Sequence, residues 1–277
     1  MVTLVALIHA LMTPVFDLVC WPFRPLSPMW AMAMISLLSG VAMVWIFGKV
    51  SDQQTIKAVR EEIRGNLIGV RLFQSDIGVV MRLQRRIFGD TFRYMKLALV
   101  PMVVLLVPVL MIMTQLNLRF SVRPVEPGET ALVKAFVRNA SVLEHDVILE
   151  ATSGLTVETP GVRIPSTREV IWRVRADAAG AHEMVVRVGE ATLNTRVIAG
   201  DRWGAVAQRR TGRGVWDTLL YPGEAPIPTT HTIEAVEIVY PELELRALGF
   251  TIHWLVAFFV LSVAAGFAFK NALGVEV

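Results

Sequence analysis

The sequence predicts a membrane protein in which α-helical spans are combined with an inserted all-β sandwich domain. The chain has 277 residues, of which 54% are apolar and only 18% are charged, a composition more hydrophobic than that of an average soluble domain. Windows at residues 29–47, 97–116 and 250–269 lack Asp, Glu, Lys and Arg. Each is long enough for a helix to cross a hydrocarbon core of about 30 Å. Between the second and third windows, the apolar pattern changes to the alternation typical of β-strands.

Residues 1–28 are predicted to form an interfacial amphipathic segment. No Lys or Arg precedes its apolar run and no small-x-small pattern follows it, so a cleaved secretion signal is not favoured. His9, Asp17 and the aromatic residues that follow suit a helix at the depth of the lipid headgroups. A short fourth helix that dips into the membrane is the alternative. The single cysteine, Cys20, excludes an internal disulfide and a cysteine metal cluster.

Residues 49–96 are predicted to form a cytoplasmic helical hairpin. Apolar residues recur at every third or fourth position from 56 to 70, Asp52 is a candidate N-cap, and Ser75 or Asp76 could cap the second helix. The hairpin is rich in Lys and Arg, for which anionic lipid headgroups are a better partner than nucleic acid. It is interpreted as a basic arm that anchors the spans or as a docking arm for a partner or client. The candidate docking residues are Arg60, Arg64, Arg71, Arg82, Arg85 and Arg86.

The distribution of basic residues also predicts the orientation. Span 1 (29–48) runs inward, span 2 (97–117) returns outward, and span 3 (249–270) leads to a cytoplasmic tail (271–277), since short loops rich in Lys and Arg stay in the cytoplasm. The N-terminus is then outside and the C-terminus inside. We expect the chain in a bacterial inner membrane, with residues 118–248 extracytoplasmic.

Residues 118–200 are predicted to form the extracytoplasmic β-sandwich, because short alternating runs such as "EVIWRVRA" are separated by turn residues. The stretch "VEPGETALVKAFVRNAS" is similar to the opening strands of bacterial immunoglobulin-like modules, which implies a spacer or a protein-binding surface. Residues 201–248 are interpreted as an extended connector with a strand at "IEAVEIVY". The connector is expected to pack on the sandwich or on the membrane surface through Trp203, Trp216 and Tyr221.

The sequence carries no motif of a catalytic, phosphate-binding or metal site, so we expect no enzyme, no metal and no cofactor. Small residues four positions apart share one helix face and favour close helix packing. Pro101 and Pro108 fall on one face of span 2 and are predicted to bend it. The polar and packing residues of the spans are Ser36, Ser39, Gly40, Gln115, Ser262 and Gly266.

Two stretches carry a family resemblance: "PMWAMAMISLLSGVAMVWIFGKVSDQQTIKAVREEI" and "MKLALVPMVVLLVPVLMIMTQL". With the basic hairpin and a last span, they resemble the YidC/Oxa-type insertase superfamily over residues 1–118 and 249–272. The arrangement is similar in particular to minimal three-span members, such as the archaeal YidC-like proteins and the insertase subunit of the endoplasmic-reticulum membrane complex. The resemblance implies a groove open to the cytoplasm and client membrane proteins that dock first on the hairpin.

The chain departs from that family pattern in two ways. Bacterial YidC proteins carry an arginine in the groove, whereas the three apolar windows hold no charge, and the β-domain is a large insertion for a minimal member. A non-catalytic scaffold or accessory subunit that links cytoplasmic and envelope partners is the alternative function. A water-accessible cavity beside Ser36, Ser39, Gln115 and Ser262 would favour the insertase, and dry, tightly packed helices would favour the scaffold. Clients and oligomeric state are left open by the sequence.

Overall fold

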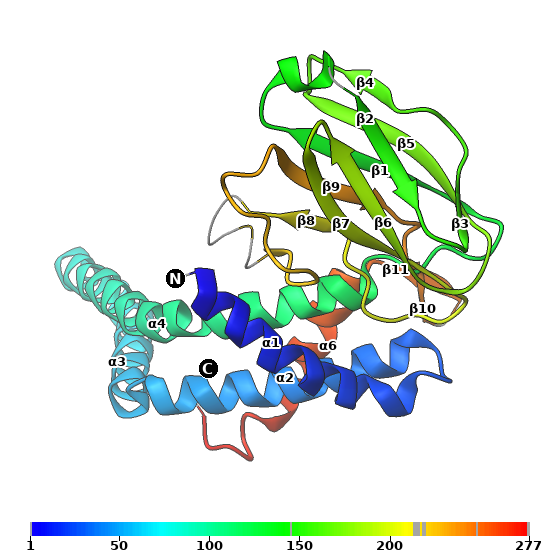
Figure 1. The fold of residues 1–277 in the computed structure, drawn as a ribbon. Coiled ribbons are helices and arrows are strands. Elements are labelled where there is room, and N and C mark those ends of the chain that lie inside the picture. The colour runs from blue at the N-terminus through cyan, green and yellow to red at the C-terminus, as the bar shows by residue number, and fades with distance from the viewer. Residues whose placement is uncertain (1, 145, 213–216, 218–219, 248, 276–277) are drawn as a thin grey trace. The chain divides into compact units, whose positions relative to one another are not determined.

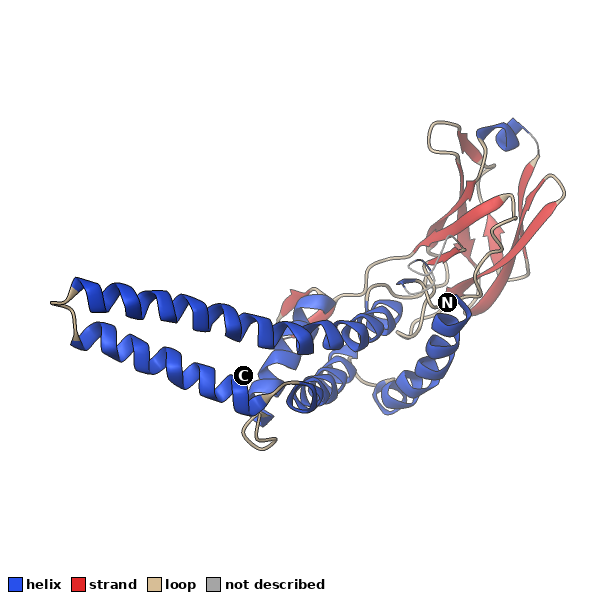
Figure 2. Ribbon diagram, turned by 90° about the vertical axis from the view of Figure 1, so that its left-hand side faces the viewer, coloured by secondary structure: helices blue, strands red, loops and turns tan. Residues whose placement is uncertain are grey.

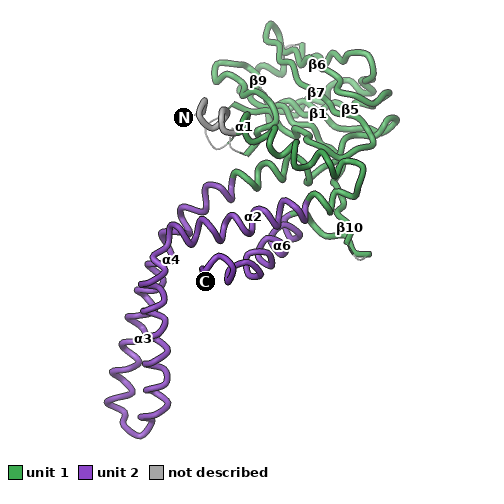
Figure 3. Tube along the Cα trace, turned by 90° about the horizontal axis from the view of Figure 1, so that it is seen from below, with its two compact units in different colours: residues 1–31, 111–254 green, residues 32–110, 255–277 purple. Residues whose placement is uncertain are grey.

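The structure is a computed structural model with helices at both ends of the chain and β-strands between them (Figure 1). It describes residues 2–144, 146–212, 217, 220–247 and 249–275. The chain divides into two compact units, coloured separately in Figure 3. Unit 1 comprises residues 1–31 and 111–254, and unit 2 comprises residues 32–110 and 255–277.

Two helices of unit 2 begin where the sequence provides capping groups. After α2 (Pro28–Val50), α3 (Gln53–Leu72) begins next to Asp52, whose side-chain oxygen accepts the backbone N–H of Thr55 at 3.0 Å. This hydrogen bond confirms the predicted N-cap. The long helix α4 (Ile77–Phe120) begins after Asp76, whose carboxylate accepts the backbone N–H of Val79 at 3.1 Å. Asp76 is therefore the cap of the second helix.

Helix α3 and the first part of α4 form a helical hairpin (Figure 2). Both helices carry a row of less exposed residues at spacings of three and four, as expected where two helices pack side by side. Across the hairpin, Asn66 Nδ2 donates to Asp90 Oδ2 at 3.2 Å. The rows are Ile56, Val59, Ile63, Asn66 and Val70 on α3, and Val80, Leu83, Ile87, Asp90 and Tyr94 on α4.

Helix α4 joins the predicted second hairpin helix and the predicted second span into one element. Its 44 residues extend over about 66 Å at 1.5 Å per residue. Pro101 and Pro108 lie inside this uninterrupted helix, and the bend expected from them stays a prediction. Of the described helices, α2 and α4 are both long and apolar enough to cross a membrane.

The third predicted span is shorter in the structure than expected. Helix α6 (Trp254–Phe269) has 16 residues, fewer than the roughly 20 that a membrane-spanning helix needs. The expected start of the span, Phe250–Ile252, is instead strand β11, which pairs with β10 (Leu245–Ala247). Gly249 between them has a φ of +86°, which glycine adopts without steric strain. The apolar run therefore continues from a strand into a helix, and its hydropathy does not distinguish the two.

Unit 1 begins with α1 (Val2–Cys20), the predicted interfacial segment, followed by a short 3₁₀ turn (Trp21–Phe23). After α4, the chain forms two antiparallel sheets in addition to the β10–β11 pair. The larger has the order β3-β5-β1-β9-β8, with β4 also paired to β5, and the smaller has the order β2-β6-β7. The strands are β1 (Thr130–Val137), β2 (Val147–Ala151), β3 (Leu155–Val157), β4 (Val162–Ile164), β5 (Glu169–Ala176), β6 (Gly180–Val188), β7 (Ala191–Ala199), β8 (Arg209–Thr211) and β9 (Ile233–Val239). A short 3₁₀ helix, Ala140–Glu144, follows β1.

Both sheets contribute to one buried hydrophobic cluster, which is the core of the β-domain. Every second residue of β1 is buried, in agreement with the alternation seen in the sequence. Val133 of β1 is opposite Trp172 of β5, and both side chains are almost fully buried. From the smaller sheet, Met184 and Val186 of β6 join the same cluster.

The strand predicted at "IEAVEIVY" is present as β9, but it is part of the larger sheet and not of an extended connector. This strand lies between β1 and β8 in the larger sheet, with Ile238 opposite Val133, and its Ile233 and Val236 are buried in the core. Of the expected packing residues, Trp203 stacks on Phe120 with ring centroids 5.4 Å apart. The Tyr221 ring lies 5.6 Å from the Arg209 guanidinium, and Trp216 lies outside the described residues.

Candidate functional site

Unit 2 contains a groove of about 310 Å³ along its apolar helices. Its walls come from α2, α4 and α6, and four of the predicted packing residues lie in them. Hydrophobic and aromatic side chains form most of the lining, which is typical of sites for apolar ligands. The lining residues are Ser39, Gly40, Met43, Val44, Val109, Phe258, Phe259, Ser262, Val263, Gly266, Phe267 and Lys270.

The groove exists beside a close contact between α2 and α6 that depends on glycine. A β-carbon at Gly40 would collide with the backbone carbonyl oxygen of Ser262, and one at Gly266 would come within 3.1 Å of Val44 Cγ2. These glycines belong to two Ser-x-x-x-Gly pairs, Ser36 with Gly40 on α2 and Ser262 with Gly266 on α6. Their spacing predicts close helix packing, and the structure brings the two pairs together.

Polar groups in this part of unit 2 are few. Ser39 is buried, and Ser262 Oγ donates to the Phe259 carbonyl at 3.1 Å. Ser36 is fully buried, and its hydroxyl has no hydrogen-bond partner among the described residues. Lys270 places a cationic group at the C-terminal end of α6, where it lies 5.3 Å from the Phe267 ring. The groove can therefore hold an apolar segment and offers a cation at one end.

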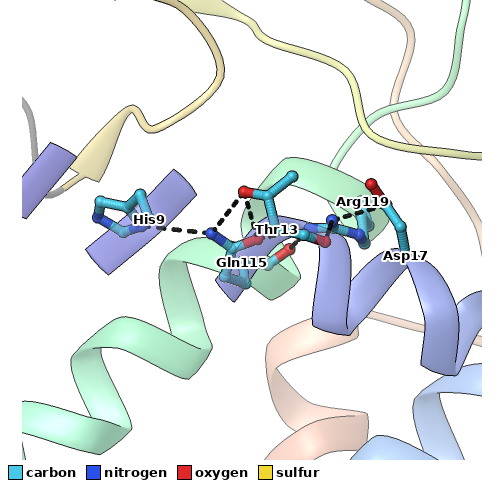
Figure 4. Close-up of polar contacts among 5 residues, drawn as sticks. All are labelled: His9, Thr13, Asp17, Gln115 and Arg119. Atoms are coloured by element: carbon cyan, nitrogen blue, oxygen red, sulfur yellow. Dashed lines mark hydrogen bonds and ion pairs between the residues drawn. The ribbon is translucent and has the colours of Figure 1, made fainter. Parts of the chain in front are cut away.

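A second candidate site, in unit 1, is a buried polar cluster between α1 and the end of α4 (Figure 4). Arg119 is 1% exposed, and its Nη2 donates to Asp17 Oδ1 at 2.7 Å and to the Thr13 carbonyl at 3.0 Å. Its Nη1 donates to Gln115 Oε1 at 2.7 Å. Gln115 Nε2 continues the chain of contacts to His9 Nδ1 at 3.2 Å and to Thr13 Oγ1 at 3.3 Å.

The chemistry of arginine assigns the orientation of the other groups. A guanidinium has donors and no acceptor, so the Gln115 atom that faces Arg119 has to be the oxygen. The Gln115 amide NH₂ then faces His9, whose Nδ1 must accept. His9 in this arrangement is the neutral tautomer with its proton on Nε2.

The two ends of the ion pair have different exposure. The Asp17 side chain is 41% exposed, whereas Arg119 and Gln115 are enclosed. A buried guanidinium is costly unless it is paired and hydrogen-bonded. The Arg119 head group has four acceptors for its terminal nitrogens and lies 5.6 Å from the Phe16 ring. The cluster can therefore hold a charge inside a largely apolar helical region.

Sequence reasoning missed this cluster, although it used four of the five residues for other purposes. His9 and Asp17 supported an interfacial helix, Gln115 was a packing residue, and Arg119 was assigned to the outer segment. A signal existed in the spacing: His9, Thr13 and Asp17 are four residues apart in turn, as are Gln115 and Arg119, so each set shares one helix face. Neither spacing shows that this face of α1 packs against this face of α4.

The predicted docking residues of the hairpin are not gathered into one site. Arg60 is half-buried, whereas Arg64 and Arg71 on the same helix are exposed. Lys57, Arg60 and Arg64 border a shallow depression of about 540 Å³ along α3, together with Glu61, Ile63 and Leu67. The remaining candidates are exposed on α4, namely Arg82, Arg85 and Arg86.

Comparison with known proteins gives no family: no protein-family model, curated protein or solved structure matches this chain.

Proposed function

We propose that this protein is a YidC-like membrane-protein biogenesis factor of a bacterial inner membrane. In this proposal α2, α4 and α6 are its three spans, the hairpin is cytoplasmic, and the β-domain is an immunoglobulin-like sandwich on the outer side. Client membrane proteins dock on the basic hairpin and then pass to the groove. The observation that carries the proposal is the groove itself, which adjoins Ser39 and Ser262 and combines apolar walls with Lys270.

The physical basis is the cost of moving polar groups through hydrocarbon. A charged side chain at the centre of a bilayer costs about 2.5–3.5 kcal/mol on insertion scales. A lateral groove lowers this cost by covering one side of the client while its apolar side stays in lipid. The methionine and phenylalanine side chains that line the groove adapt to different client shapes.

The polar cluster would have a supporting role in this function. Arg119 is bound to Asp17, Thr13 and Gln115 and does not line the groove. The chain therefore keeps its difference from bacterial YidC proteins, whose arginine is in the groove. We propose that the cluster joins α1 to the outer end of α4, which the groove requires as a wall.

Site-specific photocrosslinking in cells tests the proposal. A photoreactive amino acid is placed at Arg82 or Arg86 on the hairpin and at Ser39 or Ser262 in the groove, with exposed Glu190 in the β-domain as control. We expect crosslinks to newly made membrane proteins at the hairpin first and at the groove later, and their loss when synthesis is chased. Absence of crosslinks to nascent chains at all four positions would refute insertion.

A scaffold is the second candidate, favoured by the composition of the groove. Only Ser39, Ser262 and Lys270 among its lining residues have polar side chains. Such apolar walls would equally suit a groove that is permanently occupied by lipid or by another subunit. Stable crosslinks from the groove to one resident protein, unaffected by the chase, would establish this alternative.

A further inference from the structure

Helix α4 carries an exposed apolar row on the part that lies in the hairpin. Ile77, Met81, Phe88, Phe92 and Met95 are between 57% and 78% exposed. At about 100° per residue these five positions fall within roughly 60° of one another around the helix, so they form one stripe, with Gln84 and Arg85 between Met81 and Phe88. An apolar stripe of this length is unusual on a surface that faces only water.

The stripe is separate from the row that packs against α3. Val80, Leu83 and Ile87 of the packing row are centred about 120° away from the stripe around α4. Both helices are already paired through their packing rows, for example at Asn66 and Asp90. The apolar stripe is therefore not needed to hold the hairpin together.

Helix α3 carries its basic side chains on the same face of the hairpin. Lys57, Arg60, Arg64 and Arg71 fall within about 60° of one another around α3, and they are centred about 110° from its packing row. On each helix, the row in question lies about 110–120° from the packing row in the direction in which the residues advance around the helix. Seen from one end of the hairpin, this rotation is clockwise on one helix and anticlockwise on the other, because the helices are right-handed and antiparallel. The basic row of α3 and the apolar stripe of α4 therefore lie on the same face of the hairpin. That face combines cations on one helix with apolar side chains on the other.

The hairpin runs across the direction of α2 rather than continuing it. Figure 3 shows α2 crossing the view while α3 and the first part of α4 run down from its end, all within unit 2. In Figure 2, α2 is seen nearly end-on and the hairpin extends to the side, with α4 above α3. We call the face that carries the α3 cations and the α4 stripe the mixed face. With α4 above α3 in this view, the right-handed rotation described above places the mixed face on the far side of the hairpin, which is the side on which α2 lies.

We propose that the hairpin lies on the surface of the membrane that α2 crosses and binds its anionic phospholipids through this mixed face. Lys57, Arg60, Arg64 and Arg71 contact the headgroups, and the α4 stripe enters the boundary between headgroups and acyl chains. Amphipathic helices with basic and aromatic side chains bind in this manner, and each Lys or Arg near an anionic surface adds to the attraction. The inference requires α2 to cross the membrane but does not depend on insertion of clients.

The charge of the α3 side chains and the direction of the hairpin relative to α2 favour a lipid surface over a protein as the partner. The cations of α3 match anionic headgroups, and a hairpin that extends sideways from the end of a spanning helix stays at the depth of those headgroups. Arg82 and Arg86 of α4 lie on the opposite face or on the outer edge of the hairpin by the same helical geometry. These two arginines stay available for a client or a cytoplasmic partner.

The depth of nitroxide labels on the full chain in nanodiscs tests the inference. In a Cys20→Ser background, labels at Phe88→Cys and Phe92→Cys report on the stripe, and labels at Glu62→Cys and Arg86→Cys report on the opposite face. We expect oxygen to relax the stripe labels more than a water-soluble nickel complex does in phosphatidylglycerol-containing discs. The control labels should show the reverse order. Stripe labels as accessible to nickel as the controls would overturn the proposal.

Charge reversal supplies a second and independent measurement. Arg64→Glu with Arg71→Glu should shift the stripe labels toward the aqueous reagent in phosphatidylglycerol discs, whereas Arg82→Glu with Arg86→Glu should leave them unchanged. Equal effects of both pairs would contradict a lipid-binding face on α3. Stripe labels that become protected only after an apolar client peptide is added would assign the stripe to a client instead. Because the assay contains no newly made protein, its failure and the failure of the insertase proposal are distinguishable.

Discussion

Two helix contacts in this protein, one in each unit, are held by opposite means. In unit 1, α1 and α4 meet through a buried ion pair and a series of hydrogen bonds around Arg119. In unit 2, α2 and α6 approach closely because Gly40 has no side chain to collide with the Ser262 backbone. The first contact depends on charge compensation and the second on shape, so the same kind of substitution should affect them differently.

The largest effect is expected from Asp17→Leu. Arg119 is 1% exposed, so this substitution leaves a buried cation without its carboxylate, and loss of one partner of a buried pair costs about 3–5 kcal/mol. Because Asp17 is 41% exposed, we expect the lower part of that range. Unfolding in detergent, followed by tryptophan fluorescence, measures the difference.

A double variant sharpens the test of charge compensation. Asp17→Leu combined with Arg119→Met removes both charges, and apolar replacement of a buried pair is often close to neutral. We expect the double variant to recover most of the stability that the single variant loses. Equal loss in both variants would mean that the ion pair is not the source of the effect.

The next effect concerns shape and uses one substitution at two glycines. Gly40→Ala should cost about 1–3 kcal/mol, since the new methyl group would meet the Ser262 carbonyl oxygen. Gly65→Ala on α3 has no atom within 4 Å of the new methyl group and should stabilise the helix by up to about 1 kcal/mol. Opposite signs in the same unfolding assay are the expected result. A Gly40→Ala variant as stable as the wild type would show that α2 and α6 do not approach closely.

A smaller effect is expected from an ion pair at the entrance to the β-domain, where Arg123 binds both carboxylate oxygens of Glu129 at 2.8 and 2.9 Å. These hydrogen bonds lower the pKa of Glu129 below its ordinary value. A lowered folded-state pKa contributes stability above the unfolded-state pKa, and this contribution is lost as the pH falls through the folded-state value. Because both side chains are about one-third exposed, we expect about 1 kcal/mol or less. The stability difference between wild type and Glu129→Gln should therefore shrink as the pH falls below about 4.

The smallest effect is expected for Arg246→Ala. Arg246 and Glu244 are 2.8 Å apart, but their side chains are 75% and 58% exposed. Exposed pairs of this kind contribute about 0–1 kcal/mol. A change within about 0.5 kcal/mol would give the baseline for the buried pair, whereas a loss as large as that of Asp17→Leu would remove the distinction between them.

Local features of the fold could be predicted where one stretch of sequence contains the whole signal. Asp52 and Asp76 precede apolar periodicity, and both act as caps at the start of hairpin helices. The alternation in residues 130–137 likewise predicts a strand with one buried face. Hydropathy alone was less informative near residue 250, because strand β11 and helix α6 are both apolar.

Pairing between distant segments could not be predicted in the same way. The position of β9 between β1 and β8 in the larger sheet follows from its register with β1, about 100 residues away in the chain. Each strand alone shows only that it has an apolar face. The candidate sites have the same origin: Gly40 meets Ser262, and Gln115 meets His9, 106 residues apart in sequence.

The sequence by itself determined the apolar helices, the basic hairpin, the alternating strands and the caps, because each depends on neighbours within a few residues. Only the tertiary structure decided that Arg119 would be buried against Asp17, that the groove would form beside Gly40, and that the apolar stripe of α4 would share a face with the cations of α3. Those outcomes depend on which faces of separate elements meet. The physical reason is that burial, charge compensation and close packing are properties of pairs of surfaces, and a single helical or strand pattern specifies only one member of each pair.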